Sequence, residues 1–590
     1  MKTRVSVIIP VYNVQEFLED CLDSVLNQSI NNMELTDGYE RNLQIIIVDD
    51  GSTDDSSLIA KNYAEEHDNI EYVYEENQGL GHARNYGCKF AVGDYIIFLD
   101  SDDMVAPKAY ERMYKAAIKN NSDMTVGMVW RFNSKRYWTI KLHEIAFSGT
   151  KDVTHITESP ELFYDTTSWN KLIKRTFWDK HQFEFPEGML YEDIPVAIPM
   201  HYLANNVSVI YDECYFWRVR EGIAKSITQT TDDMKNLKDR LSAMRMVDEF
   251  FDKNVTEKEL FKTKNTKWLR IDLMIFINKL VSISTPEAEQ SMNALLEYVE
   301  KNFDQSDFES LNEFERLKYE YLLDHDLKRL VDELTFELEE LKTSEIYYQN
   351  SHLMMDLDEE TLNRPSICID KFIKDERKIS YLTKVSLDKN KLTVEGFTII
   401  PGLEDKSFDD REYSFQLVNS DSHKRIPLKS NNIKINNFKS FKIPYNDNFS
   451  YEASGYKVSV PYNELINNPD FMGENKLLVT FKQEGVIHNY FAGAAKGNVR
   501  ATSKLKGKVY ENHYFGTDFN LNRELVVNIS TVKHVFEEVA IEDQKLCIHS
   551  PENNGDIFLC YDEDSVNPEI RIPFNYDDNG KYYYIDIDSN

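Results

Sequence analysis

Two acidic clusters in the first part of the chain each follow a short apolar run that is predicted to be a strand. Asp-Ser-Asp-Asp occupies positions 100–103 after apolar residues 95–99, and Asp-Asp-Gly-Ser occupies positions 49–52 after apolar residues 43–48. Carboxylates two positions apart, such as Asp100 and Asp102, can converge on one divalent cation, which prefers oxygen ligands. An isolated Asp-x-Asp is more often a solvated turn or a helix cap, but both clusters are expected to open on one sheet edge, where ligands bind. Together they predict a ligand site that holds a metal ion.

The elements that would position these clusters alternate between short apolar strands and amphipathic helices. Strands are predicted at residues 5–9, 43–48, 70–74 and 95–99, with helices at 16–27, 56–67 and 83–92 between them. Such alternation indicates βαβ units and a mostly parallel sheet that is covered on both faces. This is the pattern of an α/β nucleotide-binding fold. The polar residues 30–42 are predicted to be a surface insertion.

Two phosphate-binding motifs are excluded. Residues 79–84 begin like Gly-x-Gly-x-x-Gly, but Arg84 occupies the last glycine position, and the chain contains no Gly-x-x-x-x-Gly-Lys-[Ser/Thr] sequence. These departures argue against a Rossmann dehydrogenase and against a P-loop ATPase.

Four motifs together resemble a known family. They are Val-Ser-Val-Ile-Ile-Pro-Val-Tyr-Asn at 5–13, Ile-Val-Asp-Asp-Gly-Ser-Thr-Asp at 47–54, Glu-Asn-Gln-Gly-Leu-Gly-His-Ala-Arg-Asn-Tyr-Gly at 76–87, and Gly-Asp-Tyr-Ile-Ile-Phe-Leu-Asp-Ser-Asp-Asp at 93–103. Their order and spacing resemble the family 2 inverting glycosyltransferases of GT-A fold. The resemblance covers about residues 1–230, is closest before residue 110, and implies an α/β GT-A (Rossmann-like) catalytic domain.

The resemblance implies roles for residues in these motifs. Asp100 and Asp102 would hold Mg²⁺ or Mn²⁺ against the diphosphate of a UDP-sugar, because a divalent cation neutralises the charge on departing UDP without requiring a proton. The other implied donor-binding residues are Pro10, Tyr12, Asn13 and Asp50 at the uracil and ribose, Asn77 and Arg84 beneath the nucleotide and sugar, and Ser101 between the two aspartates.

Inverting transfer also needs a base that takes the proton from the acceptor hydroxyl. The family supplies an aspartate late in the catalytic domain, commonly in a Glu-Asp pair, and Glu192-Asp193 matches it. The resemblance therefore implies Asp193 as the base and Glu192 as a neighbour that positions the acceptor. Such a pair is usually surface charge, but its apolar flanks suggest partial burial, which would raise a carboxyl pKa. A glycosidase would also use two carboxylates, but it needs no clamp for a metal and a diphosphate.

Two basic segments complete the expected donor site. Lys171, in Ser-Trp-Asn-Lys-Leu at 168–172, lies in a segment that resembles one bordering the donor sugar. Residues 217–228, with Arg218, Arg220 and Lys225, resemble a loop that can close over the diphosphate. Arginine and lysine are suitable partners for phosphate oxygens. The alternative is that these are ordinary surface basic residues paired with the many acids. Arg218 and Arg220 would point to one face if this segment is extended.

Beyond the catalytic region, placed at residues 1–231, the pattern changes twice. Residues 232–362 carry apolar stripes at helical spacing and predict a helical linker that packs against or spaces its neighbours. Residues 363–590 show short alternating strand patterns broken by Asn, Asp, Gly and Pro, which suit two β-sandwich-like domains. The boundary between them is placed near residue 490, giving domains 363–490 and 491–590.

Composition limits the partners and the compartment. The 101 acidic and 68 basic residues give a net charge of −33, which argues against a general nucleic-acid binder and against broad adsorption to anionic lipid. The six cysteines are scattered singly, which favours a reduced, cytoplasmic protein. No signal peptide and no transmembrane run is predicted. Work on an envelope polymer, with peripheral membrane association, is therefore expected at the inner face of the membrane.

The order of the predicted domains resembles the wall teichoic acid glycosyltransferases of Gram-positive bacteria, particularly the poly(ribitol-phosphate) β-N-acetylglucosaminyltransferases. That resemblance implies transfer of GlcNAc from UDP-GlcNAc to a polyol-phosphate envelope polymer, and a homotrimer formed through the C-terminal β region. The alternatives are a capsular or exopolysaccharide glycosyltransferase, and a C-terminal half that acts chiefly as a carbohydrate- or partner-binding module.

A teichoic acid acceptor is a polyanion, so binding it to this acidic chain requires a local basic track. The candidates are Lys171, Arg218, Arg220 and Lys225 in the catalytic region and Lys496, Arg500, Lys504, Lys506 and Lys508 in the β region. Without a positive surface leading to Glu192 and Asp193, a neutral glycan becomes the better acceptor.

Overall fold

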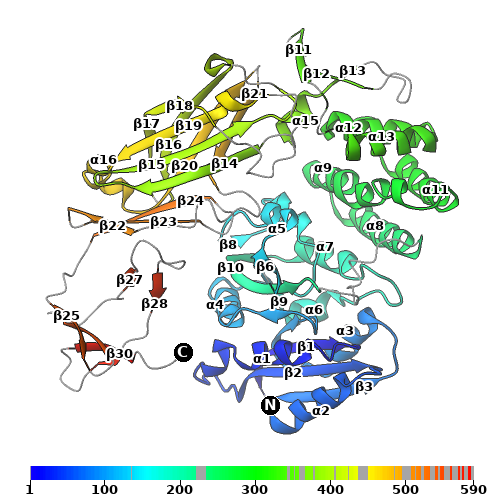
Figure 1. The fold of residues 1–590 in the computed structure, drawn as a ribbon. Coiled ribbons are helices and arrows are strands. Elements are labelled where there is room, and N and C mark those ends of the chain that lie inside the picture. Colours follow the sequence, from blue (N-terminus) through cyan, green and yellow to red (C-terminus); the bar gives the residue numbers. More distant parts are fainter. Residues whose placement is uncertain are drawn as a thin grey trace. The chain divides into compact units, whose positions relative to one another are not determined.

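The computed structural model forms two compact units (Figure 1). The first comprises residues 1–311 and 315–334, and the second comprises residues 312–314 and 335–590. The structure describes residues 2–134, 136–220, 234–341, 344, 346–350, 352–357, 366–375, 379–403, 407–420, 422, 424–435, 450–483, 486–493, 507–511, 513–519 and 524–531, and the backbone of six short strands between 538 and 586. Of the predicted basic track, Lys225, Lys496, Arg500, Lys504, Lys506 and the side chain of Lys508 lie outside the described residues.

The first unit is built on a ten-stranded sheet with the order β3-β2-β1-β4-β9-β6-β10-β5, in which β7 pairs with β6 and β8 with β10. Strands β1 to β4 pair in parallel, as the alternating pattern predicted. Beyond β4 the sheet is mixed, because β9 pairs antiparallel with both β4 and β6. The strands are β1 (Thr3–Val11), β2 (Arg41–Asp50), β3 (Ile70–Glu75), β4 (Gly93–Phe98), β5 (Met104–Val105), β6 (Met124–Asn133), β7 (Arg136–Trp138), β8 (Lys151–Thr154), β9 (Lys171–Lys174) and β10 (Val207–Arg218).

Helices connect and cover these strands. They are α1 (Leu18–Leu26), α2 (Ser56–Glu66), α3 (Leu80–Cys88), α4 (Ala109–Asn120), α5 (Lys141–Ala146), α6 (Arg175–His181) and α7 (Ile194–Leu203), with 3₁₀ turns η1 (Ser29–Asn32) and η2 (Pro160–Tyr164). Every residue of β1 is buried, which is why the strand reads as a nearly continuous apolar run. The predicted insertion at residues 30–42 follows α1, contains most of η1 and ends with the first two residues of β2.

The helical segment begins at Met234 within the described residues and packs on the 3₁₀ turn η2. Phe163 of η2 lies with its ring centroid 5.7 Å from that of Phe251 and 5.1 Å from that of Trp268. The segment comprises α8 (Met234–Asn254), α9 (Lys258–Lys267), the π-helical turn η4 (Trp268–Leu273), α10 (Met274–Ile277), η5 (Leu280–Ser282), α11 (Thr285–Asn302), η6 (Asp307–Ser310), α12 (Glu313–Leu323) and α13 (Leu327–Glu339). Aromatic contacts therefore join α8 and η4 to η2 within the first unit.

The second unit contains a β-sandwich, as the alternating pattern predicted. A four-stranded sheet, β14-β15-β19-β18, and a seven-stranded sheet, β17-β16-β20-β24-β23-β22 with β21 on β20, share one hydrophobic core that includes Val394, Val458, Leu477 and Val527. Because β20 pairs with β24, the larger sheet continues across residue 490, and the predicted domain boundary falls inside a sheet.

The remaining elements of the second unit are short. A three-stranded sheet, β11-β12-β13, precedes the sandwich, and sheets β25-β26-β30-β29 and β27-β28 follow it.

All strands of the second unit, including those of the sandwich, have the following bounds: β11 (Ile346–Gln349), β12 (His352–Asp356), β13 (Ser366–Cys368), β14 (Ile379–Leu387), β15 (Lys391–Ile399), β16 (Arg411–Asn419), β17 (Arg425–Leu428), β18 (Ser430–Ile433), β19 (Gly455–Pro461), β20 (Gly473–Gln483), β21 (Val486–Phe491), β22 (Gly507–Tyr510), β23 (His513–Phe519), β24 (Leu525–Thr531), β25 (Glu538–Glu542), β26 (Lys545–His549), β27 (Phe558–Cys560), β28 (Glu569–Arg571), β29 (Asn575–Tyr576) and β30 (Tyr582–Asp586). The helical elements are α15 (Asp370–Asp375), α16 (Tyr462–Ile466), η7 (Phe408–Asp410), η9 (Glu452–Ser454) and η10 (Pro469–Phe471). None of the helices in the described part of the chain is both long enough and apolar enough to span a membrane.

Candidate active site

The ends of β1, β2 and β4 lie at one edge of the sheet, because β1 pairs in parallel with both of the other strands. Pro10 is buried within β1, and Tyr12, just beyond its end, is 49% exposed. Asn13 joins the β1 end to the turn after β2, since its Oδ1 accepts a hydrogen bond from the Thr53 amide at 2.8 Å. The predicted uracil- and ribose-binding residues of β1 therefore lie beside the Asp-Asp-Gly-Ser turn.

Asp50 fixes the segment that leads into α3. Its Oδ1 accepts a hydrogen bond from the Gln78 amide at 2.7 Å, and its Oδ2 accepts one from the Gly79 amide at 2.9 Å. Gly79 has a φ of +95°, which glycine adopts without steric cost, and α3 begins at the next residue. Asp50 is thus buried and bonded to the backbone, whereas Asn77 beside it is exposed.

Arg84 of α3 links two of the acidic clusters. It is 1% exposed, and its Nη2 donates to Asp100 Oδ1 at 2.7 Å while its Nη1 donates to Glu192 Oε1. A Cβ on Gly81 would lie 2.4 Å from the carbonyl oxygen of Pro186, so α3 packs directly on the segment that leads to Glu192. The close packing allows one guanidinium to reach both carboxylates.

The Asp-Ser-Asp-Asp turn is bonded to the end of β10 and to the residues that follow it. Arg220 donates from Nε to Asp102 Oδ2 at 2.7 Å, and Arg218 donates from Nε to the Asp102 carbonyl at 2.7 Å. The buried Asp103 accepts from the Tyr215 hydroxyl at 2.6 Å and from the Arg218 amide at 2.7 Å. Asp103 was not among the predicted site residues, although it anchors the backbone of Arg218 to the turn.

Asp100 and Asp102 fit a divalent cation. Their side chains are 25% and 16% exposed, and each has one oxygen bonded to an arginine. The second oxygen of each carboxylate has no hydrogen-bond partner among the described residues, and the buried Ser101 lies between them. Burial raises the pKa of Asp102, Arg220 opposes this, and the nearby charge of Asp100 adds to it. A cation would relieve the repulsion between the two carboxylates.

Lys171 lies in a buried polar cluster. Its Nζ donates to Asp165 Oδ2 at 2.6 Å, and Nε2 of His201 lies 3.0 Å from the same oxygen. Burial lowers the pKa of Lys171, while the charge of Asp165 opposes that change. Trp169 in the same segment stacks on Tyr215 with ring centroids 4.0 Å apart. The ammonium of Lys171 is therefore completely buried and committed to Asp165.

Glu192 and Asp193 immediately precede α7, and their environments differ. Glu192 is buried and bonded to Arg84, whereas Asp193 is partly exposed and its carboxylate makes no hydrogen bond or ion pair with the described residues. Burial, together with the charge of Glu192, raises the pKa of Asp193 to about 7, although the charges of Arg84 and Arg240 lower it in part. An unpaired carboxylate with this pKa can accept a proton near neutral pH.

Helix α8 holds the residues that precede this pair. Tyr191 has a φ of +64°, which is unusual for a bulky residue. Its hydroxyl donates to Asn236 Oδ1 at 2.5 Å, and the Arg240 guanidinium carbon lies 4.1 Å from its ring centroid. The Leu190 amide donates to Asp239 Oδ2 at 3.0 Å. Three residues of α8 thus maintain a strained backbone next to Glu192, and none of them was predicted to act at the site.

Residues 6–192 match the family model described as glycosyl transferase family 2, which is the family that the four motifs resemble. Curated relatives include Glycosyltransferase GlyA of Streptococcus pneumoniae, 32% identical over 227 residues that cover 37% of this chain and 31% of that protein. Another is the poly(ribitol-phosphate) beta-glucosyltransferase of Bacillus spizizenii, 27% identical over 312 residues that cover 49% of this chain and 46% of that protein. The chain spans less than half the length of these two relatives.

Two solved structures of S. aureus TarS share this fold. One covers 100% of this chain and 96% of its own, with a TM-score of 0.52 and 14% identity. The other, TarS 1–349 in complex with UDP-GlcNAc, covers 62% of this chain and 100% of its own, with a TM-score of 0.50 and 19% identity. The predicted fold class, a GT-A domain followed by helices and β-sandwich-like sheets, is confirmed.

Proposed function

We propose that this chain transfers a sugar from a UDP-sugar to a hydroxyl group of a cell-envelope polymer, with inversion at the anomeric carbon. The observation that carries the proposal is the bridge through Arg84, which bonds to Asp100 in the candidate metal turn and to Glu192 next to the unpaired Asp193. Direct displacement requires the donor phosphates and the base to lie in one site. The bridge supports such a site.

The donor would bind along the carboxyl ends of β1, β2 and β4. The exposed ring of Tyr12 is suited to stack on a base, and Asp100 and Asp102 would hold Mg²⁺ or Mn²⁺ against the diphosphate. The cation would supply charge neutralisation at the departing UDP. Arg218 and Arg220, now paired with Asp20 and Asp102, carry guanidinium groups that diphosphate oxygens can engage instead.

Asp193 would accept the proton of the attacking hydroxyl. The new bond forms between the acceptor oxygen and the anomeric carbon while the bond to the UDP oxygen breaks, and the proton moves to Asp193. Glu192 is held in place by Arg84 and would orient the acceptor. This division of roles follows from the different bonding of two adjacent carboxylates.

For the substrates, we propose UDP-GlcNAc as the donor and wall teichoic acid as the acceptor. The solved complex of TarS 1–349 with UDP-GlcNAc supports the choice of donor, and the relative named poly(ribitol-phosphate) beta-glucosyltransferase supports the choice of acceptor. A neutral glycan is the second candidate, because the described residues of the expected basic track are engaged. Lys171 is buried against Asp165, and Arg218 and Arg220 pair with carboxylates.

A screen of UDP-sugars against purified ribitol-phosphate polymer, capsular polysaccharide and neutral glycan, reading out released UDP, separates these candidates. We expect UDP-GlcNAc with the ribitol-phosphate polymer to release UDP fastest, and NMR of the product to show inversion. Faster release with a neutral glycan would select the second candidate, and release with no acceptor would contradict the proposal.

Light scattering of the full chain tests the predicted homotrimer.

Removal of the metal is expected to abolish transfer. We expect EDTA to stop UDP release and Mn²⁺ to restore it, because the leaving diphosphate then lacks its counter-charge. Asp102→Asn should lower kcat by about 10²-fold or more even with Mn²⁺ present. The matched control is Asp179→Asn, which alters an exposed aspartate whose one ion pair with a described residue is to Arg175. Full activity of Asp102→Asn in EDTA would rule out this role.

The α8 contact is expected to affect the chemical step more than donor binding. Tyr191→Phe removes one hydrogen bond to Asn236, worth about 1 kcal/mol, so we expect kcat to fall about fivefold with little change in the donor KM. The control is Tyr202→Phe, which loses bonds to Asn254 and Glu257 near the other end of α7. Initial rates at varied donor concentration measure both constants. An unchanged kcat would show that this bond does not position the base.

A further inference from the structure

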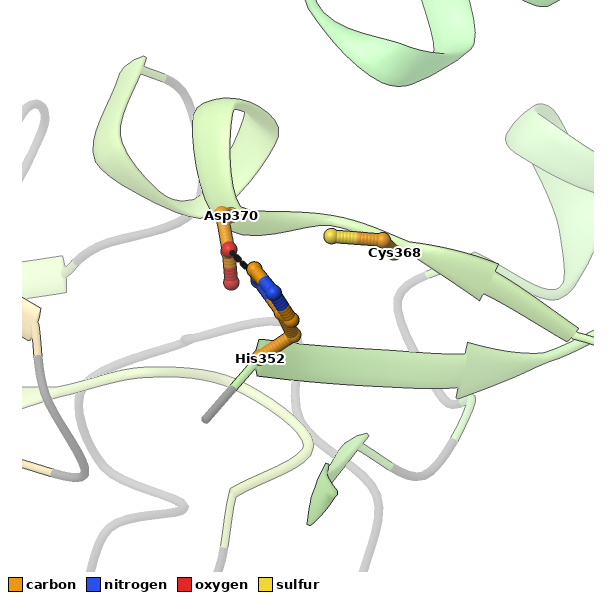
Figure 2. A group of neighbouring side chains, drawn as sticks. All are labelled: His352, Cys368 and Asp370. Carbon is orange, nitrogen blue, oxygen red and sulfur yellow. Dashed lines mark hydrogen bonds and ion pairs between the residues drawn. The ribbon is translucent and has the colours of Figure 1, made fainter. Parts of the chain in front are cut away.

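Three side chains of types that can bind a metal ion lie together in the second unit. In the sequence they are far from the residues assigned to glycosyl transfer. His352 begins β12, Cys368 ends β13 and Asp370 begins α15. One donor atom from each side chain lies within 4.8 Å of the other two. Figure 2 shows His352 and Cys368 both pointing toward Asp370. The three side chains thus offer sulfur, nitrogen and oxygen to one small space.

Backbone hydrogen bonds fix these residues relative to one another. The Leu353 amide donates to Asp370 Oδ1 at 2.8 Å, and the Ile369 amide donates to the Leu353 carbonyl at 2.8 Å. The second oxygen of Asp370 lies 2.6 Å from Nδ1 of His352. Carboxylates and imidazoles oriented by such bonds are typical of metal ligands. The Leu353 amide and His352 thus hold both oxygens of Asp370, although the side chains of His352 and Asp370 are 58% and 42% exposed.

The donor set favours zinc. Thiolate and imidazole are preferred by Zn²⁺, whereas Mg²⁺ and Ca²⁺ prefer oxygen ligands alone. With zinc bonds of about 2.0–2.3 Å, donor atoms in a tetrahedral site lie about 3.3–3.8 Å apart. The three donor atoms lie within 4.8 Å of one another, and the His352 and Asp370 donors are 2.6 Å apart, so the cluster has the dimensions of such a site.

The local charge also favours a cation. Glu313 accepts hydrogen bonds from the Lys371 and Phe372 amides at 3.1 and 2.8 Å, which brings a second carboxylate to the start of α15. A bound Zn²⁺ would displace the Cys368 thiol proton into solvent and neutralise the resulting thiolate.

We propose that His352, Cys368 and Asp370 bind one Zn²⁺ ion per chain, with water at the fourth position. The ion would tie β12 to β13 and to the start of α15. This site is independent of the proposed glycosyl transfer, and its test does not depend on that activity.

The test uses the full chain, stripped of metal and then dialysed against Zn²⁺ in excess Mg²⁺, which occupies the oxygen-ligand site proposed at Asp100 and Asp102. We expect one zinc per chain by elemental analysis, and at least tenfold weaker zinc binding in Cys368→Ser and in His352→Ala. Co²⁺ in place of zinc should give a thiolate-to-cobalt charge-transfer band that Cys368→Ser lacks. Zinc should also raise the melting midpoint of the wild type but not of these variants.

Cys88→Ser and His325→Ala are the matched controls, because Cys88 lies in α3 and His325 bonds to Asn293 in the helical segment. Both should retain full zinc binding and the cobalt band. Absence of zinc from the wild type, or undiminished binding by Cys368→Ser and His352→Ala, would overturn the proposal. So would equal loss in the two controls.

Discussion

Asp193→Asn is expected to lower kcat for glycosyl transfer by about 10³-fold or more, since the amide cannot accept the hydroxyl proton. Donor binding should persist, because the carboxylate of Asp193 makes no bond to the described donor-site residues. UDP release measures the first effect and calorimetric titration with UDP-sugar measures the second. Asp179→Asn again serves as the control. Full transfer by Asp193→Asn would assign the base to another residue.

The pH dependence of transfer and of stability tests the role of Asp193 independently. Because the base must be deprotonated, kcat/KM should rise with pH through about 7. The folded chain holds this proton above the ordinary aspartate pKa, so the contribution of Asp193 to stability is present at acid pH and is lost as pH rises through about 7. Asp193→Asn should therefore raise the melting midpoint by a few degrees near pH 8 and leave it unchanged near pH 4. A lower midpoint near pH 8 would contradict the burial of an unpaired charge.

Arg84→Met is expected to have the largest effect on stability. The substitution keeps an apolar stem of similar length but removes the guanidinium between Asp100 and Glu192. Removing one partner of a buried ion pair costs about 3–5 kcal/mol, because a buried charge is left uncompensated. Glu192 accounts for most of this cost, since Asp100 is partly exposed and screened by solvent. Urea unfolding of the full chain measures the change, and transfer should be lost as well.

A second substitution separates charge from packing. Arg84→Met combined with Glu192→Gln should regain much of the lost stability, because the uncompensated carboxylate is gone, but it should not regain transfer. Arg112→Met is the control, since Arg112 is 42% exposed and 3.9 Å from Asp212. A loss of less than about 1 kcal/mol in Arg84→Met would mean that the bridge is not the structural link proposed here.

The parts of the fold that could be predicted are those whose pattern lies within one contiguous stretch of the sequence. The ends of β1, β2 and β4 carry the motifs directly, and a buried parallel strand has an apolar run as its signature. The antiparallel β9 could not be predicted in the same way, because its four residues carry no signal of direction. Likewise, β20 and β24 are separated by a stretch that resembled a boundary, yet they pair in one sheet.

The contacts that organise the site were beyond sequence reasoning, since they join distant positions. Arg84 and Glu192 are 108 residues apart, and nothing in either motif specifies the other. The positive φ of Tyr191 is imposed by α8, because tyrosine has no intrinsic preference for it. Lys171 was expected beside the donor sugar because its segment resembles one that borders that sugar. Its burial follows from Asp165 and His201, whose roles only the folded chain reveals.

The contact between α8 and Tyr191 has a consequence for how this protein can be divided. The family match ends at residue 192, but the backbone before Asp193 is held by residues 236, 239 and 240. A fragment that ends at residue 192, where the family match ends, would lose these restraints, together with the packing of Phe251 on Phe163. A fragment of this chain based on the family match must therefore include α8 to keep these restraints, so the structural unit around the site is longer than the matched motifs.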